Sequence, residues 1–373
     1  MNFKIKLIDK YISKEVLMTT LVGMTLFTVI WVSPEILFRI IRSVIGHEYS
    51  ALQGLKIFCL EIPLVLGKAI PMGLLLGCLW VFDSLSKNFE LTILRSVGVS
   101  FKRLLAPVLV ISVLFSVLSF LTFDQFIPYS RKILDAGDAG SMNEQFVYVD
   151  KDKDNKPKQI IIISNFDGKK IYNINVLRLS TQNDLMVPLL RNIYNAPFAI
   201  YENNAIYLVD GVNYIINDEN IFKQITHFDS VKILENEKAK ALVALMSYST
   251  QKNRNLTGGE LSRYLKLLKE EGMQEEFNYN LNKYLQRFFD SISCIFLAVL
   301  GCILGYARPR EKRLFGFTTA VGVIFAYYIF IPLLDLLAQK GVLPPLITAA
   351  FPCAIVIAAI WASMKYKNIN IMQ

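Results

Sequence analysis

Six long apolar segments dominate the pattern of hydrophobic and polar positions along the chain. A helix needs about 20 mostly apolar residues to cross a lipid bilayer. Segments of this kind run approximately over residues 16–40, 55–82, 104–126, 288–306, 315–337 and 344–364. Three of them come before a polar middle region and three come after it. The pattern therefore predicts a membrane protein with six transmembrane helices in a three-plus-three arrangement.

The middle region has the pattern of an all-β domain. Short alternating or apolar runs cover residues 146–149, 159–164, 171–179, 185–196, 198–202, 205–208, 212–216 and 221–234. Turn-forming pairs such as Asn203-Asn204 and Asp210-Gly211 separate them. About eight short strands without a helix favour a sandwich or a jelly roll. The expected domains are residues 1–135, with an N-terminal helix and three spans, residues 136–255, with the β domain, and residues 256–373, with the last three spans.

A further amphipathic helix is predicted just before the fourth span. Thr257 and Glu260 have the spacing of a capping box, in which two side chains satisfy free backbone N–H groups at the start of a helix. Apolar residues then recur at the helical period, at Leu261, Tyr264, Leu265 and Leu268. We expect this linker helix to lie outside the membrane and to lead into the fourth span.

Basic residues indicate the orientation of the predicted spans. They concentrate before the first span, between the second and third, between the fourth and fifth, and after the sixth. These residues are Lys4, Lys6, Lys10, Lys14, Lys87, Arg95, Lys102, Arg103, Arg308, Arg310, Lys312, Arg313, Lys365 and Lys367. The positive-inside rule makes their side of the membrane cytoplasmic. Both chain ends are therefore expected in the cytoplasm, and the β domain on the far side of the membrane.

Composition argues against several other functions. The chain has 373 residues, of which 53% are hydrophobic and only 19% are charged. Its net charge of +9 is explained by the basic residues in loops, and no basic stripe interleaved with aromatic residues predicts nucleic-acid binding. The five cysteines lie in apolar segments, without the spacing of metal ligands or of a disulfide framework. Neither a metal site nor a nucleic-acid partner is expected.

No catalytic residue is predicted. A nucleotide-binding P-loop requires a glycine, four residues, then Gly-Lys and a hydroxyl residue. The pairs Gly67-Lys68 and Gly168-Lys169 lack both the earlier glycine and the hydroxyl residue that should follow. His47 and His227 are more readily explained as solvated or hydrogen-bonded side chains than as catalytic groups.

The loop between the second and third spans predicts a short amphipathic helix. Phe89, Ile93 and Val97 fall on one helical stripe, with Leu94 beside it. Glu90 and Arg95 flank this stripe, and Gly98 can end the helix in a left-handed conformation. The apolar stripe could rest on lipid headgroups. It could equally dock into a groove of a soluble partner.

The same loop resembles the signature of a known family. The segment Glu90-Leu91-Thr92-Ile93-Leu94-Arg95-Ser96-Val97-Gly98-Val99-Ser100 is similar to the signature of the LptF/LptG permeases, also called the YjgP/YjgQ family. Further similar segments are Asp9-Lys10-Tyr11, Ile70-Pro71-Met72, Asp124-Gln125-Phe126-Ile127-Pro128, Thr257-Gly258-Gly259-Glu260-Leu261, Gly305-Tyr306-Ala307-Arg308 and Gly341-Val342-Leu343-Pro344-Pro345. The chain departs from the family at Arg287-Phe288-Phe289-Asp290, where a proline is usual.

The resemblance implies a permease subunit of the ABC transporter that extracts lipopolysaccharide from the inner membrane. It implies a periplasmic jelly roll, a sister LptF or LptG subunit, and two LptB subunits that bind ATP and Mg²⁺. The jelly roll would pass lipopolysaccharide to the jelly rolls of LptC and LptA. Contact with the ATPase would fall on the residues Phe89, Glu90, Ile93, Leu94 and Arg95. The chain itself would need no cofactor.

Two other classes of function stay open at this point. The chain could be the permease of a different ABC-type lipid exporter. It could also be a scaffold that anchors a β domain to the membrane without transporting anything. The sequence does not decide between the LptF and LptG roles.

Basic residues near the outer ends of the spans form a candidate lipid site. Arginine can grip phosphates with two parallel hydrogen bonds, and the lipopolysaccharide headgroup is anionic. The hypothesis is a basic rim made of Arg39, Arg42, Lys68, Arg131 and Lys132. In the alternative, Lys68 pairs with Glu61, seven residues earlier in the same span, and the others extend to the membrane surface.

Overall fold

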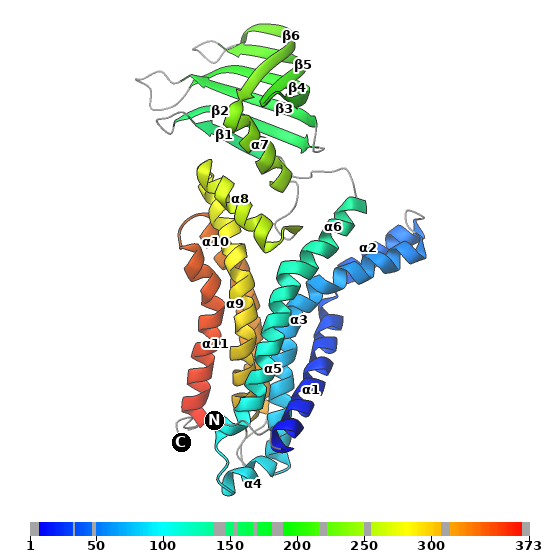
Figure 1. The fold of residues 1–373 in the computed structure, drawn as a ribbon, viewed down its shortest axis with the longest axis vertical. Helices are drawn as coiled ribbons and strands as arrows, with labels where there is room; N and C mark the ends of the chain where they lie inside the picture. Colours follow the sequence, from blue (N-terminus) through cyan, green and yellow to red (C-terminus); the bar gives the residue numbers. More distant parts are fainter. Residues whose placement is uncertain are drawn as a thin grey trace. The chain divides into compact units, whose positions relative to one another are not determined.

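The computed structural model describes residues 7–32, 34–46, 50–137, 146–151, 156–166, 170–180, 189–216, 222–249, 255–306 and 314–367 (Figure 1). The chain divides into two compact units. The span unit comprises Met1–Leu134, Thr257–Leu261 and Met273–Gln373. The β unit comprises Asp135–Leu256 and Ser262–Gly272.

The described part of the span unit contains six helices that are long and apolar enough to cross a membrane. They are α1 (Leu7–Trp31), α3 (Ala51–Lys87), α5 (Phe101–Leu121) with its continuation, α9 (Gln274–Gly305), α10 (Leu314–Gln339) and α11 (Pro345–Lys367). Three lie before the strands in the chain and three after them, which confirms the prediction of a three-plus-three membrane protein with an inserted β domain.

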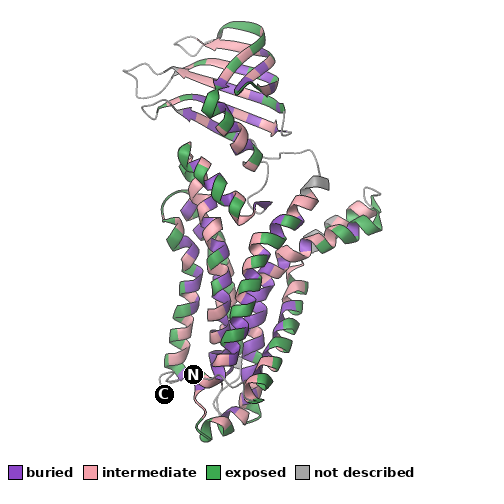
Figure 2. Ribbon diagram, viewed as in Figure 1, coloured by how far each residue is buried: buried purple, intermediate pink, exposed green. Residues whose placement is uncertain are grey.

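Two helices form the centre of the span unit. Figure 2 shows that α3 and α9 are largely buried, whereas α1 and α10 expose much of their length. Apolar side chains of both central helices join one core cluster, including Leu74, Cys78, Ala298 and Cys302. Helix α1 approaches α3 so closely that a Cβ atom on Gly73 would lie 2.6 Å from the backbone nitrogen of Met24. Small residues permit this kind of contact between spans.

The first span is shorter than predicted. The sequence pattern runs to about residue 40, but α1 ends at Trp31 and a separate helix, α2, covers Pro34–Ile45. Proline lacks the N–H group that a continuing helix needs and is well tolerated at the start of a new one. The α2 side chains Ile40 and Val44 lie against Gly54 of α3.

The third span continues beyond its predicted end through a π-helical segment, η1 (Thr122–Phe126), into α6 (Ile127–Gly137). Within η1 the backbone N–H of Ile127 bonds to the carbonyl of Thr122, five residues earlier. The following residue, Pro128, has no N–H group to donate, and a local π turn redistributes the bonds of the helix around it.

The fourth span begins earlier than its hydropathy predicts, at Gln274 rather than near residue 288. The first half of this helix is polar, so hydropathy alone does not predict it. Some of its polar side chains have partners within the spans, since Asn282 and Gln286 each donate to the Asp335 carboxylate of α10 at 2.8 Å.

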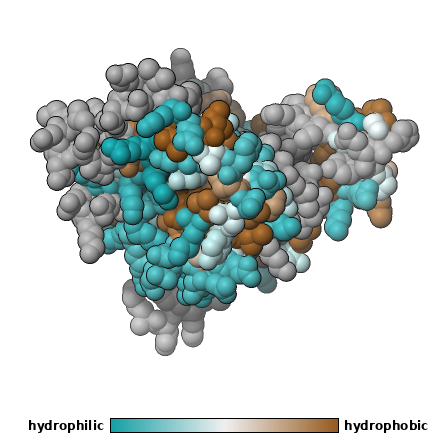
Figure 3. Space-filling view, turned by 90° about the horizontal axis from the view of Figure 1, so that it is seen from above, coloured by the Kyte–Doolittle hydropathy of each residue, from teal (hydrophilic) through white to brown (hydrophobic). Residues whose placement is uncertain are grey.

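The described strands of the β unit form one antiparallel sheet in chain order. They are β1 (Phe146–Lys151), β2 (Pro157–Phe166), β3 (Lys170–Ser180), β4 (Leu189–Glu202), β5 (Ala205–Ile216) and β6 (Phe222–Glu235). Alternate residues point to one buried face, such as Ile161 and Ile163 on β2. A few apolar side chains, including Val147 and Ile225, are exposed, and Figure 3 shows a surface where hydrophilic and hydrophobic residues intermingle.

Six described strands replace the eight predicted ones because two predicted breaks do not interrupt pairing. Strand β4 continues through Pro197, and β5 continues through Asp210-Gly211. Asp210 absorbs the local distortion with a positive φ of 55°. A proline or a turn-forming pair therefore interrupts single positions of the ladder here and does not end the strand.

A helix that the sequence reading missed follows the sheet. Helix α7 (Asn236–Ser249) packs on β5, β6 and β1, so the expectation of a β domain without a helix was wrong. Its buried residues Ala239, Leu242, Leu245 and Met246 have helical spacing, which is the signal that could have revealed it. The linker helix was predicted correctly: α8 (Gly258–Glu270) buries all four expected apolar residues.

Candidate functional site

The predicted loop helix is present as α4 (Glu90–Ser96), between α3 and α5. Left-handed residues bound it on both sides, Phe89 with φ 61° and Gly98 with φ 86°. Glycine adopts this conformation without steric cost, so the expected ending of the helix at Gly98 is confirmed. Both ends of the helix therefore turn sharply.

One face of α4 carries exposed apolar side chains. Phe89, Ile93 and Val97 are 56%, 59% and 78% exposed. The opposite face is anchored, because Leu91 is buried and Leu94 packs against the core cluster of the spans. Leu91 was missed by the sequence reading, although its apolar character was visible. The helix is thus held by one side and presents a stripe of large apolar groups on the other.

Arg95 is bound within the chain. Its Nη1 atom donates to the hydroxyl of Tyr306 at 2.6 Å, and its guanidinium lies over the Tyr306 ring at 5.6 Å. The Tyr306 ring also meets Phe101 edge-on at 5.9 Å. Lys367 at the end of α11 donates to the backbone carbonyl groups of Leu304 and Tyr306. Tyr306 therefore joins α4 to the ends of α9, α5 and α11.

The other charged residue of the predicted contact, Glu90, lies in the first turn of α4. Its carboxylate lies near Tyr11 on α1. A carboxylate is favourable at this end of a helix because the free N–H groups there carry partial positive charge. Arg95 thus connects the short helix to the end of the fourth span, and Glu90 lies beside the first.

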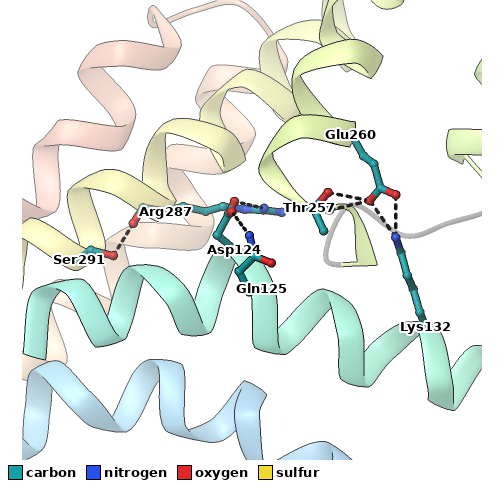
Figure 4. Close-up of polar contacts among 7 residues, drawn as sticks. All are labelled: Asp124, Gln125, Lys132, Thr257, Glu260, Arg287 and Ser291. Atoms are coloured by element: carbon teal, nitrogen blue, oxygen red, sulfur yellow. Dashed lines mark hydrogen bonds and ion pairs between the residues drawn. The ribbon is translucent and has the colours of Figure 1, made fainter.

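The candidate basic residues lie in different surroundings. Arg131 of α6 donates to both carboxylate oxygens of Glu61, at 3.1 and 2.6 Å. Lys132 donates to both carboxylate oxygens of Glu260, at 2.7 and 2.9 Å (Figure 4). Lys68 lies 5.0 Å from the centre of the Trp31 ring. The structure therefore assigns Glu61 to Arg131, and two members of the predicted rim each have a carboxylate of their own.

The two remaining members of the predicted rim belong to α2. Arg42 is exposed in the last turn of this helix. The side chain of Arg39 lies outside the described residues. Arg42 is therefore the rim residue whose exposure best suits contact with an external anion.

A buried polar cluster that sequence reasoning did not assemble joins the last three spans. The Asp335 carboxylate of α10 binds Lys283 as well as Asn282 and Gln286 of α9. Thr348 of α11 donates to Asn282 at 2.9 Å. An ionisable residue within an apolar span usually has such partners, so Asp335 was the signal for this cluster. Its polar groups satisfy one another and hold the three helices together.

Chemical groups for catalysis are not assembled in the described part of the chain. No cluster of His, Cys, Asp and Glu there could hold a metal ion. The described structure offers instead six spans, an inserted sheet and an exposed apolar stripe on a short helix between two spans. These features define a multi-pass membrane protein with an inserted β domain.

The family comparison agrees with this class. The sequence model of the lipopolysaccharide export system permease LptF/LptG matches residues 10–366, which is nearly the whole chain, and the protein belongs to this family. It is thus a multi-pass inner-membrane permease subunit for lipopolysaccharide export with an extramembrane β domain. Such subunits are not enzymes, and LptB hydrolyses the ATP. A search of curated proteins found no match.

Proposed function

We propose that this subunit receives the ATP-driven movement of an LptB-type ATPase through the exposed stripe of α4. The observation that carries the proposal is that Phe89, Ile93 and Val97 stay exposed on a helix whose other face is anchored. A short helix with an unpaired apolar face suits a groove on a soluble partner. The basic residues of the neighbouring loops place this helix on the cytoplasmic side, where ATP is available.

The predicted contact residues divide into two roles. Phe89 and Ile93, together with Val97, fill the groove of the partner. Leu94 and Arg95 position the helix, since Leu94 packs on the span core and Arg95 binds Tyr306. Glu90 lies at the edge of the stripe, beside Tyr11. A push on the apolar stripe is thereby passed to α9 and α11 through Tyr306.

The remaining partners follow from the β unit and the family. Among the described strands, β1 and β6 each have one neighbour, so each leaves an edge whose backbone groups can pair with another protein. Pairing of this kind would extend the sheet into LptC and LptA-like jelly rolls in the periplasm. A sister LptF or LptG subunit would complete the cavity for the lipid. ATP and Mg²⁺ would bind only to the ATPase.

Substitution on α4 tests the ATPase contact. Ile93→Asp places a charge in the stripe and should abolish copurification of the ATPase and ATP-dependent lipopolysaccharide release. Thr92→Ala is the matched control, because Thr92 is exposed on the same helix but is not apolar. Retention of a fully active ATPase by Ile93→Asp would overturn the contact. Absence of any ATPase from the purified wild-type complex would favour the scaffold reading.

The hypothesis of a lipid site now includes fewer residues than the predicted basic rim. We propose that Arg39 and Arg42 contact headgroup phosphates, while the roles of Lys68, Arg131 and Lys132 in lipid binding stay predictions. Replacing both arginines by glutamine should reduce photocrosslinking of lipopolysaccharide to the purified complex. Lys340→Gln, an exposed lysine in the loop between α10 and α11, is the control. Unchanged crosslinking in an intact complex would reject the contact.

A further inference from the structure

Two sequence segments singled out above have no part in the proposed function, yet the fold brings them together (Figure 4). One is the end of the third span, residues 124–128, and the other is the start of α8, residues 257–261. Asp124 lies in the π-helical segment η1, and its carboxylate lies directly against Gly258, the first residue of α8. An added Cβ at position 258 would lie 2.3 Å from Oδ1 of Asp124, so a side chain there would force the carboxylate to move.

The fourth span joins the same contact through a buried arginine. Arg287 of α9 places its Nη1 atom 3.5 Å from Oδ1 of Asp124. Their side chains are only 10% and 17% exposed. Removing either partner would leave a charge in a poorly solvated site, so this pair is expected to stay closed.

A second, more exposed ion pair lies further along the same two segments. The Glu260 carboxylate accepts hydrogen bonds from Lys132 of α6 and from the backbone N–H and hydroxyl of Thr257. Burial raises the pKa of Glu260, but the bonds from Lys132 and Thr257 outweigh it and hold the pKa below its ordinary value. The side chains of Lys132 and Glu260 are 39% and 34% exposed. This pair can therefore exchange with water more readily than the buried one.

The connectivity of the chain gives these contacts a mechanical consequence. Helix α6 is the last helix before the strands, and α8 begins shortly after α7. The first turn of α8, residues 258–261, belongs to the span unit, whereas the later part of the same helix belongs to the β unit. Helices α6 and α8 are the covalent connections along which movement of α5 and α9 can reach the strands.

We propose that a polar clasp couples movement of the spans to the inserted β domain during transport. The clasp consists of Asp124, Lys132, Thr257, Gly258, Glu260 and Arg287. The Asp124–Arg287 pair fixes the end of the third span to the fourth, and the Lys132–Glu260 pair aligns the first turn of α8 with α6. These are positioning residues: they need not touch lipid. The inference rests on the transport function of the family and on transfer of lipid through the β domain.

The test measures lipopolysaccharide transferred per ATP hydrolysed, with the whole complex in proteoliposomes and a soluble jelly-roll acceptor. Glu260→Gln removes the charge that binds Lys132 but keeps a side-chain oxygen that can accept from Thr257. It should lower this ratio about fivefold or more, because the coupling energy between two sites in one protein is commonly of that size. The rate of ATP hydrolysis should stay close to wild type. Glu270→Gln is the matched control, since Glu270 forms an exposed pair with Lys266 on the same helix, α8.

The ratio separates coupling from folding, since a smaller amount of active complex lowers transfer and hydrolysis equally. An unchanged ratio in Glu260→Gln would overturn the proposal, as would an equal loss in Glu270→Gln. If Glu260→Gln does not assemble, Asp124→Asn decides by the same ratio. Failure of the wild-type complex to transfer lipid at all would instead contradict the proposed partners.

Discussion

The two ends of the span unit differ in which side chains they expose and which they bury. At the α4 end, large apolar groups such as Ile93 are exposed while Leu91 holds the helix in place. At the clasp end, charged groups are buried or half-buried and paired, as in Asp124–Arg287 and Arg131–Glu61. The α4 end leaves apolar surface available for a partner. The clasp end satisfies its charges within the chain.

The difference shows how one subunit can offer apolar surface to a partner at its α4 end and fix the positions of its helices at the clasp end. Exposed apolar surface releases free energy only when something covers it, so the α4 end is completed by association. Buried charges cost free energy unless they are paired, so the clasp end is specific about which helices meet. The following substitutions break or sharpen this contrast, from the largest expected effect to the smallest.

Arg131→Leu should have the largest effect on stability. Glu61 is almost fully buried, and both of its oxygens are held by Arg131. Removing one partner of a buried ion pair typically costs about 3–5 kcal/mol. Thermal unfolding of the purified subunit in detergent measures the loss. Adding Glu61→Leu should recover most of it, and no recovery would show that packing rather than charge dominates.

Tyr306→Phe should have an intermediate effect, at the opposite end. The variant removes the hydroxyl that accepts from Arg95 but keeps the ring beneath the guanidinium. A hydrogen bond to a charged group contributes about 1.5–3 kcal/mol, and exposure of Arg95 should bring the loss toward about 1 kcal/mol. Limited proteolysis within α4 reports its anchoring, with Tyr366→Phe as an exposed control. Unaltered cleavage would mean that Leu91 and Leu94 are enough to anchor α4 without this hydrogen bond.

Gly98→Ala should have the smallest effect on function, with a loss of stability alone. The residue has a φ of 86°, and no atom lies within 4 Å of an added Cβ, so the cost is purely conformational. A side chain in this left-handed region costs about 1–2 kcal/mol. Urea unfolding of the subunit should show a loss of that size with no change in copurified ATPase. A large loss of ATPase would indicate that the turn itself contacts the partner.

Sequence patterns predicted those elements whose physical signal is local. Apolar runs identified the six spans, and helical spacing identified α4 and α8, because lipid exposure and one-sided burial each impose a simple period. Three features were not predicted from the sequence, also for local reasons. Pro34 ended α1 inside an apolar run, Pro197 and Gly211 did not end their strands, and α7 followed the sheet without a break in composition.

The partners of polar residues were decided only by tertiary structure. The sequence allowed Lys68 as a partner of Glu61 because both lie on α3 at helical spacing, but it gave no sign that Arg131 of another helix binds both oxygens of Glu61. In the same way, nothing local indicated that Asp124 meets Gly258 and Arg287, or that Arg95 meets Tyr306.

The sequence by itself determined the class of protein, its family, its spans and its inserted strands, since hydrophobicity, backbone preference and a contiguous signature are properties of neighbouring residues. Tertiary structure decided which charges are satisfied internally and which apolar groups stay exposed. These outcomes depend on contacts between residues far apart in the chain, such as Arg95 and Tyr306, which are separated by 211 positions. Such contacts arise only when helices distant in the chain pack side by side.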